Sequence, residues 1–217
     1  MRLNRRNPQA LRDLGDVFHL RHTIRSLCPD TAGPDSPSTG RLLYRLDTDD
    51  GDAILRVQTT GPLLLNALTN DYARAVAVER IAWSEAGFEG QLVRFLLDAN
   101  ATRAISRTGR RSKRVGIPAA EATAWWERHA SRSGLSTVEV SSLPLKPVSA
   151  RLEARNPTFL QVTRFEGLAV ITDPTALQRA VLSGMGRGRA YGLGLLRLGQ
   201  AGSEVSPPRH APQSTAP

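Results

Sequence analysis

The amino-acid sequence predicts an α+β protein built from two ferredoxin-like (RRM-like) βαββαβ units in tandem. Three observations carry this prediction. Strand-like apolar segments occur in both halves of the chain, amphipathic helix patterns lie between them, and the order strand–helix–strand–strand–helix–strand is approximated twice. The 217 residues, 40% of them hydrophobic, suffice for two units of about 100 residues. We expect domains at 1–100 and 101–198, followed by a polar, Pro-rich, disordered tail at 199–217.

The clearest element of the first half is a helix whose apolar residues recur at near-3.6 spacing. Asp16 suits its N-cap, and Pro29 closes its end. Further on, Asp50-Gly51 is a turn signal between two strand-like segments and indicates a hairpin. The elements expected in this half are, in order, strand 1–3, helix 16–28, exposed loop 29–40, hairpin strands 41–46 and 53–58, an ambiguous stretch 63–87 and strand 91–100.

The second half repeats this order after a basic segment. Its clearest signal is a helix start at Asp173-Pro174, with Asp as N-cap and Pro at the first helical position, and that helix stops at Gly184. Before it, a strand with a bend at Gly167 is expected. The elements predicted here are helix 118–133, strand 137–141, strand 159–172, helix 173–184 and strand 190–198.

Composition indicates the kind of partner. Lys and Arg number 29 against 20 Asp and Glu, so the formal net charge is +9 and the pI is near 11.0. This balance favours a polyanion, either nucleic acid or an anionic membrane surface. No apolar run approaches the ~20 residues that span a bilayer, and the N-terminus lacks the apolar core of a signal peptide. Cys28 is the sole cysteine, which excludes an internal disulfide and disfavours a cysteine-built zinc site. We expect a cytoplasmic protein.

A glycine- and arginine-rich loop at 184–194 is the leading candidate for binding a phosphate backbone. Gly184 and Gly186 allow close approach and positive φ, while Arg187 and Arg189 supply bidentate guanidinium groups. The loop joins a helix to a strand, which excludes a Rossmann loop, and no Gly-Lys-Ser/Thr occurs to form a Walker loop. The alternative is a tight connection with solvated arginines.

The segment 101–114 carries many cations and no acidic residue. Gly109 and several Ser and Thr residues argue against a helix, so we expect a flexible arm that orders on RNA. The alternative is a solvated surface loop. A membrane-surface helix would need interleaved bulky apolar residues, which are missing. The cations of this segment are Arg103, Arg107, Arg110, Arg111, Lys113 and Arg114.

Two histidines on the first helix are candidates for proton transfer. His19 and His22 lie three residues apart, opposite the apolar stripe, and imidazole suits acid–base work near pH 7. They could instead be inert surface side chains. No carboxylate or cysteine pattern joins them, so no metal site is predicted.

Taken together, these segments resemble the CRISPR-associated endoribonuclease CasE family, the crRNA-processing subunit of the type I-E Cascade complex. The matching pieces are DVFHLRHTIRSLCP, LLYRLD, FLLDANATR with SKRVGI, and FEGLAVITDPTALQRAVLSGMGRGRAYGLGLL. The resemblance implies binding of the precursor CRISPR RNA repeat hairpin and cleavage without metal or cofactor. The resemblance further implies that the RNA 2′-OH attacks the adjacent phosphate and that the protein stays on the hairpin with other Cascade subunits.

The first helix departs from the family pattern Asp-x-Tyr-x-Leu-His, whose Tyr and His belong to the active site. Phe18 stands at the Tyr position and Arg21 at the His position. Arg21 remains protonated but can stabilise phosphate charge, as can Arg189, which stands where the family carries lysine. His22 or His19 would then serve as catalytic base or acid. Alternatively, the protein binds and caps the crRNA hairpin with weak cleavage or none.

Overall fold

A computed structural model describes residues 1–28, 42–79, 83, 88–107, 110–150 and 158–202. The exposed loop expected at 29–40 and residues 203–217 of the expected tail lie outside the described residues. The elements are, in chain order, β1 (Arg2–Leu3), α1 (Pro8–Gly15), α2 (Val17–Ser26), β2 (Leu43–Asp49), β3 (Asp52–Gln58), η1 (Leu65–Ala67), β4 (Ala73–Ala75), β5 (Leu92–Ala99), β6 (Thr102–Arg107), β7 (Arg110–Gly116), η2 (Ala119–Glu121), α3 (Ala122–Arg132), β8 (Leu135–Ala150), β9 (Thr158–Ile171), α4 (Pro174–Ser183), η3 (Arg189–Tyr191) and β10 (Arg197–Gln200).

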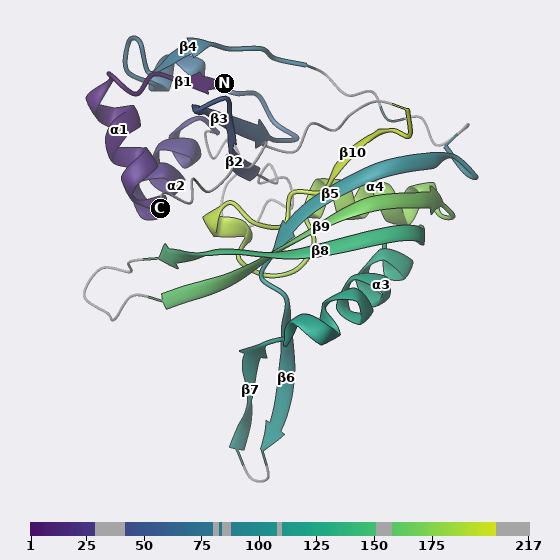
Figure 1. Ribbon diagram of the computed structural model, residues 1–217. Helices are drawn as coiled ribbons and strands as arrows, with labels where there is room; N and C mark the ends of the chain where they lie inside the picture. The colour runs from purple at the N-terminus through teal and green to yellow at the C-terminus, as the bar shows by residue number, and fades with distance from the viewer. Residues whose placement is uncertain (29–41, 80–82, 84–87, 108–109, 151–157, 203–217) are drawn as a thin grey trace, which may run out of the picture.

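Two four-stranded antiparallel sheets form the body of the molecule (Figure 1). Their strand orders are β2-β3-β1-β4 and β10-β5-β9-β8. Both sheets have the same strand order when the four strands of each are numbered 1 to 4 along the chain. The second sheet then reads 4-1-3-2, and the first sheet reads 4-1-3-2 from its β4 edge. The strands β6 and β7 form a separate hairpin, inserted between the first strand and the first helix of the second unit. The tandem ferredoxin-like prediction is confirmed.

Capping side chains account for the helices of the first unit. Asp16 accepts a hydrogen bond from the Phe18 amide at 2.9 Å and begins α2 as expected. An additional helix, α1, was not predicted: Asn7 caps it by accepting from the Ala10 amide at 3.0 Å, and Pro8 occupies its first turn. Both signals are present in the sequence, but the helix is short. The ambiguous stretch 63–87 contributes η1 and β4 among its described residues.

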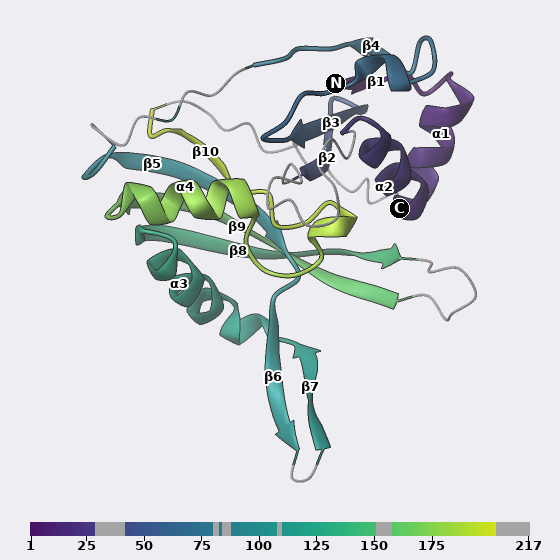
Figure 2. The ribbon, with the colours of Figure 1, turned by 180° about the vertical axis from the view of Figure 1, so that it is seen from behind.

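Aromatic packing forms the core of the second unit. The rings of Phe95 and Trp126 stack at 4.0 Å between centroids, and Trp125 stacks on Phe165 at 5.3 Å. These residues bury the face of the sheet that α3 and α4 cover (Figure 2). Asp173 caps α4 by accepting from the Ala176 amide at 2.9 Å, which confirms the predicted helix start.

Three sequence-based boundaries change in the structure. The segment 101–114, expected as a flexible arm, belongs to the paired strands β6 and β7. The strand expected at 190–198 is a loop with the turn η3 followed by β10, because Gly192 and Gly194 have φ of 80° and 85°, outside the extended region. Gly199 and Gln200, assigned to the tail, pair with β5.

The strand at 92–99, which the sequence analysis placed at the end of the first domain, pairs with β9 and β10. Its long-range partners come from residues 60 or more positions later, so local patterns carry no signal for this pairing. We propose that the second domain begins with β5 and that β6–β7 is an insertion within it.

A cluster of buried charges joins the two units. Arg45 on β2 is 2% exposed, contacts Asp47 on its own strand, and lies 3.1 Å from the Asp98 carboxylate on β5. Arg164 on β9 also pairs with Asp98, and Arg197 on β10 lies 3.9 Å from Asp47. Charges buried in this way persist when they are paired. The cluster therefore ties the first sheet to the second.

Candidate nucleic-acid interface

Helix α2 and the glycine-rich loop, far apart in the sequence, meet in the structure. The guanidinium carbon of Arg21 on α2 lies 5.7 Å from the centre of the Tyr191 ring, within cation–π range. Beside it, the Tyr44 hydroxyl on β2 donates to the Ala190 carbonyl oxygen at 2.9 Å. Burial raises the pKa of Tyr44, so its hydroxyl stays protonated as a donor. Residues from α2 and β2 thus hold the loop at residues 190–191.

Glycine is required at several positions of the loop 184–194. Gly194 has φ of 85°, and a Cβ there would lie 2.5 Å from the Met185 carbonyl oxygen. The Gly194 amide donates to the Asp98 carbonyl at 2.7 Å, and the Gly194 carbonyl accepts from the Met185 amide at 2.8 Å. The loop is therefore cross-linked internally and to β5. These hydrogen bonds restrict the conformation of the loop.

The two arginines of the loop differ in their contacts. Arg189 is exposed, and its Nη1 donates to the Ser183 carbonyl at 2.6 Å, which satisfies one of the free carbonyls at the C-terminus of α4. Arg187 is exposed, and its backbone forms an antiparallel bridge with Asn100 at the base of the β6–β7 hairpin. The bridge brings together the two segments predicted to bind RNA.

The cations of the basic segment lie on the hairpin, which projects away from the sheet (Figures 1 and 2). Lys113 and Arg114 are exposed on β7. Arg103 on β6 forms an ion pair with Glu121 of η2 at 2.7 Å, so an acidic residue outside the segment 101–114 neutralises this one cation. The pairing brings together residues 18 positions apart. Arg107 and Arg110 are directly opposite each other in the backbone register next to the tip, and Arg111 follows on β7.

The two histidine candidates are placed differently from Arg21. His22 is exposed, and His19 is half-buried with its ring edge-to-face with Phe18, 6.0 Å between centroids. The cation–π contact with Tyr191 in the loop belongs to Arg21. Since His22 follows Arg21 by one residue, it lies about 100° around α2. Arg21 therefore contacts the glycine-rich loop, whereas His22 is the exposed residue that follows Arg21 on α2.

Tyr44 and Tyr191 are residues that sequence reasoning did not single out. Tyr44 lies in an apolar strand pattern and is 3% exposed, so the pattern assigns it to the core. Tyr191 lies within the glycine-rich run. A hydroxyl on a core strand and an aromatic ring among glycines are weak signals, and the pairing with Arg21 depends on the contact between the two units.

Metal-binding clusters and membrane-spanning helices are both missing from the described residues. In that part of the chain, no group of three or more His, Cys, Asp or Glu side chains is placed to hold a metal ion. Among the helices described, none is both long enough and apolar enough to cross a membrane.

Comparison with known proteins gives the same fold and a specific family. A family model described as CRISPR associated protein matches residues 1–199. The chain is 28% identical over 216 residues to the CRISPR-associated endoribonuclease Cse3 of Thermus thermophilus, covering 90% of this chain and 96% of that protein. The solved structure of Thermus thermophilus Cse3 bound to an RNA representing a pre-cleavage complex has a TM-score of 0.74 and 30% identity, covering 91% of this chain and 95% of that chain. A chain of a CRISPR RNA-guided surveillance complex has a TM-score of 0.62 and 26% identity, covering 85% and 93%.

The family match includes α2, the whole glycine-rich loop and all of both sheets except Gln200 at the end of β10. These are also the regions on which the resemblance seen in the sequence rests. The alignments with these two solved structures cover 91% and 85% of this chain, so the similarity extends through both units. The chain belongs to the CRISPR-associated protein family.

Proposed function

We propose that this protein is a sequence-specific endoribonuclease that processes precursor CRISPR RNA at its repeat hairpin. The observation that carries the proposal is the contact between Arg21 on α2 and Tyr191 in the glycine-rich loop, which brings a cation of the first unit to the loop of the second. The relatives support it, since one is named a CRISPR-associated endoribonuclease and a similar structure holds RNA in a pre-cleavage complex.

The proposed reaction needs no metal. The 2′-oxygen adjacent to the scissile bond attacks phosphorus and gives up its proton to a base, while the bond from phosphorus to the 5′-oxygen breaks. An acid supplies a proton to the leaving 5′-oxygen. The products are a 2′,3′-cyclic phosphate and a 5′-OH. Negative charge builds on the non-bridging phosphate oxygens, so fixed guanidinium groups lower the barrier.

The residues divide into two proposed roles. Arg21 stabilises the phosphate charge, because a guanidinium remains protonated and cannot act as a base at neutral pH. Arg189 holds the end of α4 and presents its remaining donors beside the same loop. His22 is the proposed base or acid, with His19 as the second candidate, because both are on α2 next to Arg21.

The basic hairpin and the loop are proposed to grip the RNA outside the cleavage position. Their cations, with the net charge of +9, favour a phosphate backbone. We further propose that the protein remains on the repeat hairpin after cleavage, in the cytoplasm, and joins other Cascade subunits. The likeness to a chain of a surveillance complex supports that assembly.

The test is cleavage of the cognate repeat RNA in EDTA by the wild-type protein and by Arg21→Ala, His22→Ala and His19→Ala variants. We expect wild type to give a 2′,3′-cyclic phosphate product. The cleavage rate should be at least about 100-fold lower in the variant that lacks the proton-transfer residue, which we propose to be His22→Ala, with His19→Ala as the second candidate. Tight binding without cleavage by wild type would reject the endoribonuclease and favour a subunit that caps the hairpin. The relatives' activity does not favour that alternative.

A further inference from the structure

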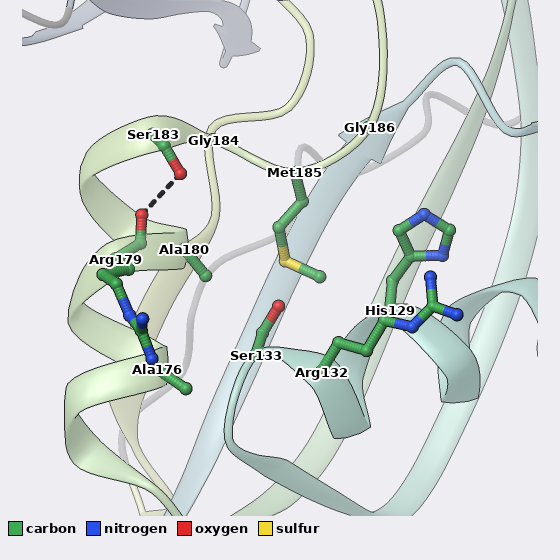
Figure 3. Close-up of a pocket in the computed structure, with 10 residues that line it drawn as sticks. All are labelled: His129, Arg132, Ser133, Ala176, Arg179, Ala180, Ser183, Gly184, Met185 and Gly186. Atoms are coloured by element: carbon green, nitrogen blue, oxygen red, sulfur yellow. Dashed lines mark hydrogen bonds between the residues drawn. The ribbon is translucent and has the colours of Figure 1, made fainter.

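The two ends of the glycine-rich loop are anchored by the second unit. At its start the chain leaves α4, and the side chain of Met185 lies between α3 and α4 (Figure 3). Met185 is 4% exposed and belongs to the aromatic core of that unit. At the far end, the Gly194 amide donates to the Asp98 carbonyl on β5. The helices and the sheet from which the loop arises therefore fix both of its ends.

The middle of the loop is held by the first unit. The turn η3 spans Arg189–Tyr191 and contacts both α2 and β2. The Tyr44 hydroxyl on β2 donates to the Ala190 carbonyl oxygen at 2.9 Å, across 146 positions of sequence. The Tyr44 ring lies against Gly192, where an added Cβ would be 3.0 Å from Tyr44 Cε2. One side chain of the first unit thus contacts the loop through its ring and through its hydroxyl.

Tyr44 is placed to act through its neighbours rather than on RNA itself. Its side chain is 3% exposed and packs in the core of the first unit. Its hydroxyl proton is used in the bond to Ala190. Burial raises the pKa of this hydroxyl, and the nearby charge of Arg21 opposes the rise but does not cancel it. Any effect of Tyr44 on cleavage must therefore pass through the turn that its hydroxyl holds.

The turn η3 carries two side chains of the proposed site. Tyr191 supplies the ring on which the guanidinium of Arg21 lies, and Arg189 begins the turn. Gly188 and Gly192 flank the turn with φ of 83° and 80°. Glycine restricts the backbone less than any other residue, so these flanks contribute little to holding the turn in place. Contacts from outside the loop, the hydroxyl bond among them, then set the position of both side chains.

We propose that Tyr44 is a positioning residue for RNA cleavage, because its hydroxyl fixes the turn η3 against Arg21. This inference rests on the proposed function, since the step it supports is stabilisation of charge on the scissile phosphate. The β6–β7 hairpin and Arg187, which are proposed to grip the RNA, lie outside the turn. Loss of the hydroxyl should therefore slow cleavage and leave the affinity for RNA unchanged.

The test compares two variants that each lose one buried hydroxyl. Tyr44→Phe keeps the ring beside Gly192 and removes the bond to the loop. Tyr72→Phe is the matched control, because Tyr72 is 1% exposed in the same core and its hydroxyl donates to Asp13 on α1 at 2.9 Å. We expect single-turnover cleavage at saturating protein to be about tenfold slower in Tyr44→Phe. The Kd for a repeat RNA made uncleavable by a 2′-deoxy substitution should stay within about twofold of wild type, as should both quantities in Tyr72→Phe.

A double substitution tests whether Tyr44 acts through the turn. Urea unfolding first establishes that each variant is folded under the assay conditions. The variant Tyr44→Phe/Tyr191→Leu should then cleave within about twofold of the rate of Tyr44→Phe alone, because the second substitution removes a contact that is already disturbed. The pH dependence of the cleavage rate in Tyr44→Phe should match that of wild type, because a positioning residue exchanges no proton with the RNA.

Four outcomes would overturn the inference. Cleavage by Tyr44→Phe at the wild-type rate, or an equal loss in Tyr72→Phe, would leave the hydroxyl without a specific role. Losses that multiply in the double variant would show that Tyr44 acts independently of the turn. A changed pH dependence would assign Tyr44 to proton transfer, and weaker RNA binding with an unchanged rate at saturation would assign it to binding. Absence of cleavage by wild type that binds the repeat would instead reject the proposed function.

Discussion

Arg164 donates two hydrogen bonds to the Asp98 carboxylate, from Nε at 2.9 Å and from Nη2 at 3.0 Å. The same carboxylate lies 3.1 Å from a guanidinium nitrogen of Arg45, which belongs to the other sheet. The Asp98 carbonyl also accepts the Gly194 amide at 2.7 Å. One residue on β5 therefore joins both units and the glycine-rich loop.

The substitution Asp98→Asn should strongly destabilise the protein. It keeps the shape of the side chain but removes the carboxylate that pairs with Arg164 and one of the two that pair with Arg45. Breaking a buried pair costs about 3–5 kcal/mol. Urea denaturation would measure this as a lower midpoint. The control is Asp52→Asn, which breaks the exposed pair with Arg2 and should cost less than about 1 kcal/mol. Equal losses would contradict the role assigned to the buried cluster.

The substitution Gly194→Ala should impair RNA binding as well as stability. A methyl group there meets the Met185 carbonyl at 2.5 Å in addition to the strain of φ at 85°. Gly51→Ala is the control, because Gly51 has φ of 82° but nothing within 4 Å of the added carbon. That control should lose about 1–2 kcal/mol, from backbone strain alone. The free energy of unfolding and the Kd for repeat RNA distinguish the two, and an equal loss in both variants would indicate that the loop accommodates the methyl group.

Replacing Tyr191 separates its ring from its hydroxyl. Tyr191→Phe keeps the face on which Arg21 lies, so the cleavage rate should stay within about twofold of wild type. Tyr191→Leu removes the ring and should lower the rate by about two- to fivefold, corresponding to an exposed cation–π contact of about 0.5–1 kcal/mol. Single-turnover cleavage provides the measurement. A large loss in Tyr191→Phe would instead indicate that the hydroxyl takes part in proton transfer.

Stability should fall as the pH is lowered through the titration of His129. Burial lowers its pKa below the usual 6.5, helped by Arg128 and Arg132, against the opposing effect of its bond to the Trp125 carbonyl. The unfolded chain then binds more protons, so the stabilisation present above pH 6.5 is lost towards the lower folded-state pKa.

The measurement is urea unfolding at about pH 7.5 and about pH 5.5, on either side of the ordinary histidine pKa, for wild type and for His129→Gln, which cannot titrate in this range. The decrease between the two pH values should be smaller in His129→Gln than in wild type. A decrease of the same size in both proteins would assign the pH dependence to other groups.

Much of the fold follows from interactions within a few residues, and these could be predicted. Asp16 and Asp173 cap helices because their side chains accept amides two or three positions later. Asp50 and Gly51 turn a hairpin because both adopt positive φ. The excess of Arg and Lys likewise indicated a polyanionic partner from composition alone.

The candidate site depends on longer-range contacts. Arg21 meets Tyr191 and Tyr44 meets Ala190 because the two sheets are tied through the buried pair of Arg45 and Asp98. The sequence separations are 170, 146 and 53 residues, obtained from 191 − 21, 190 − 44 and 98 − 45. Local sequence propensity cannot predict contacts between residues that are this far apart in the sequence.

The charge and glycine pattern of the loop at 184–194 were thus readable from the chain, as were the caps and the tandem order of elements. The tertiary structure decided which side chain of the first helix faces that loop, that the basic segment is a hairpin, and that β5 belongs to the second sheet. The physical reason is that caps and turns are stabilised by neighbours in the chain. Interfaces are stabilised by burial and pairing that exist after the whole chain has folded.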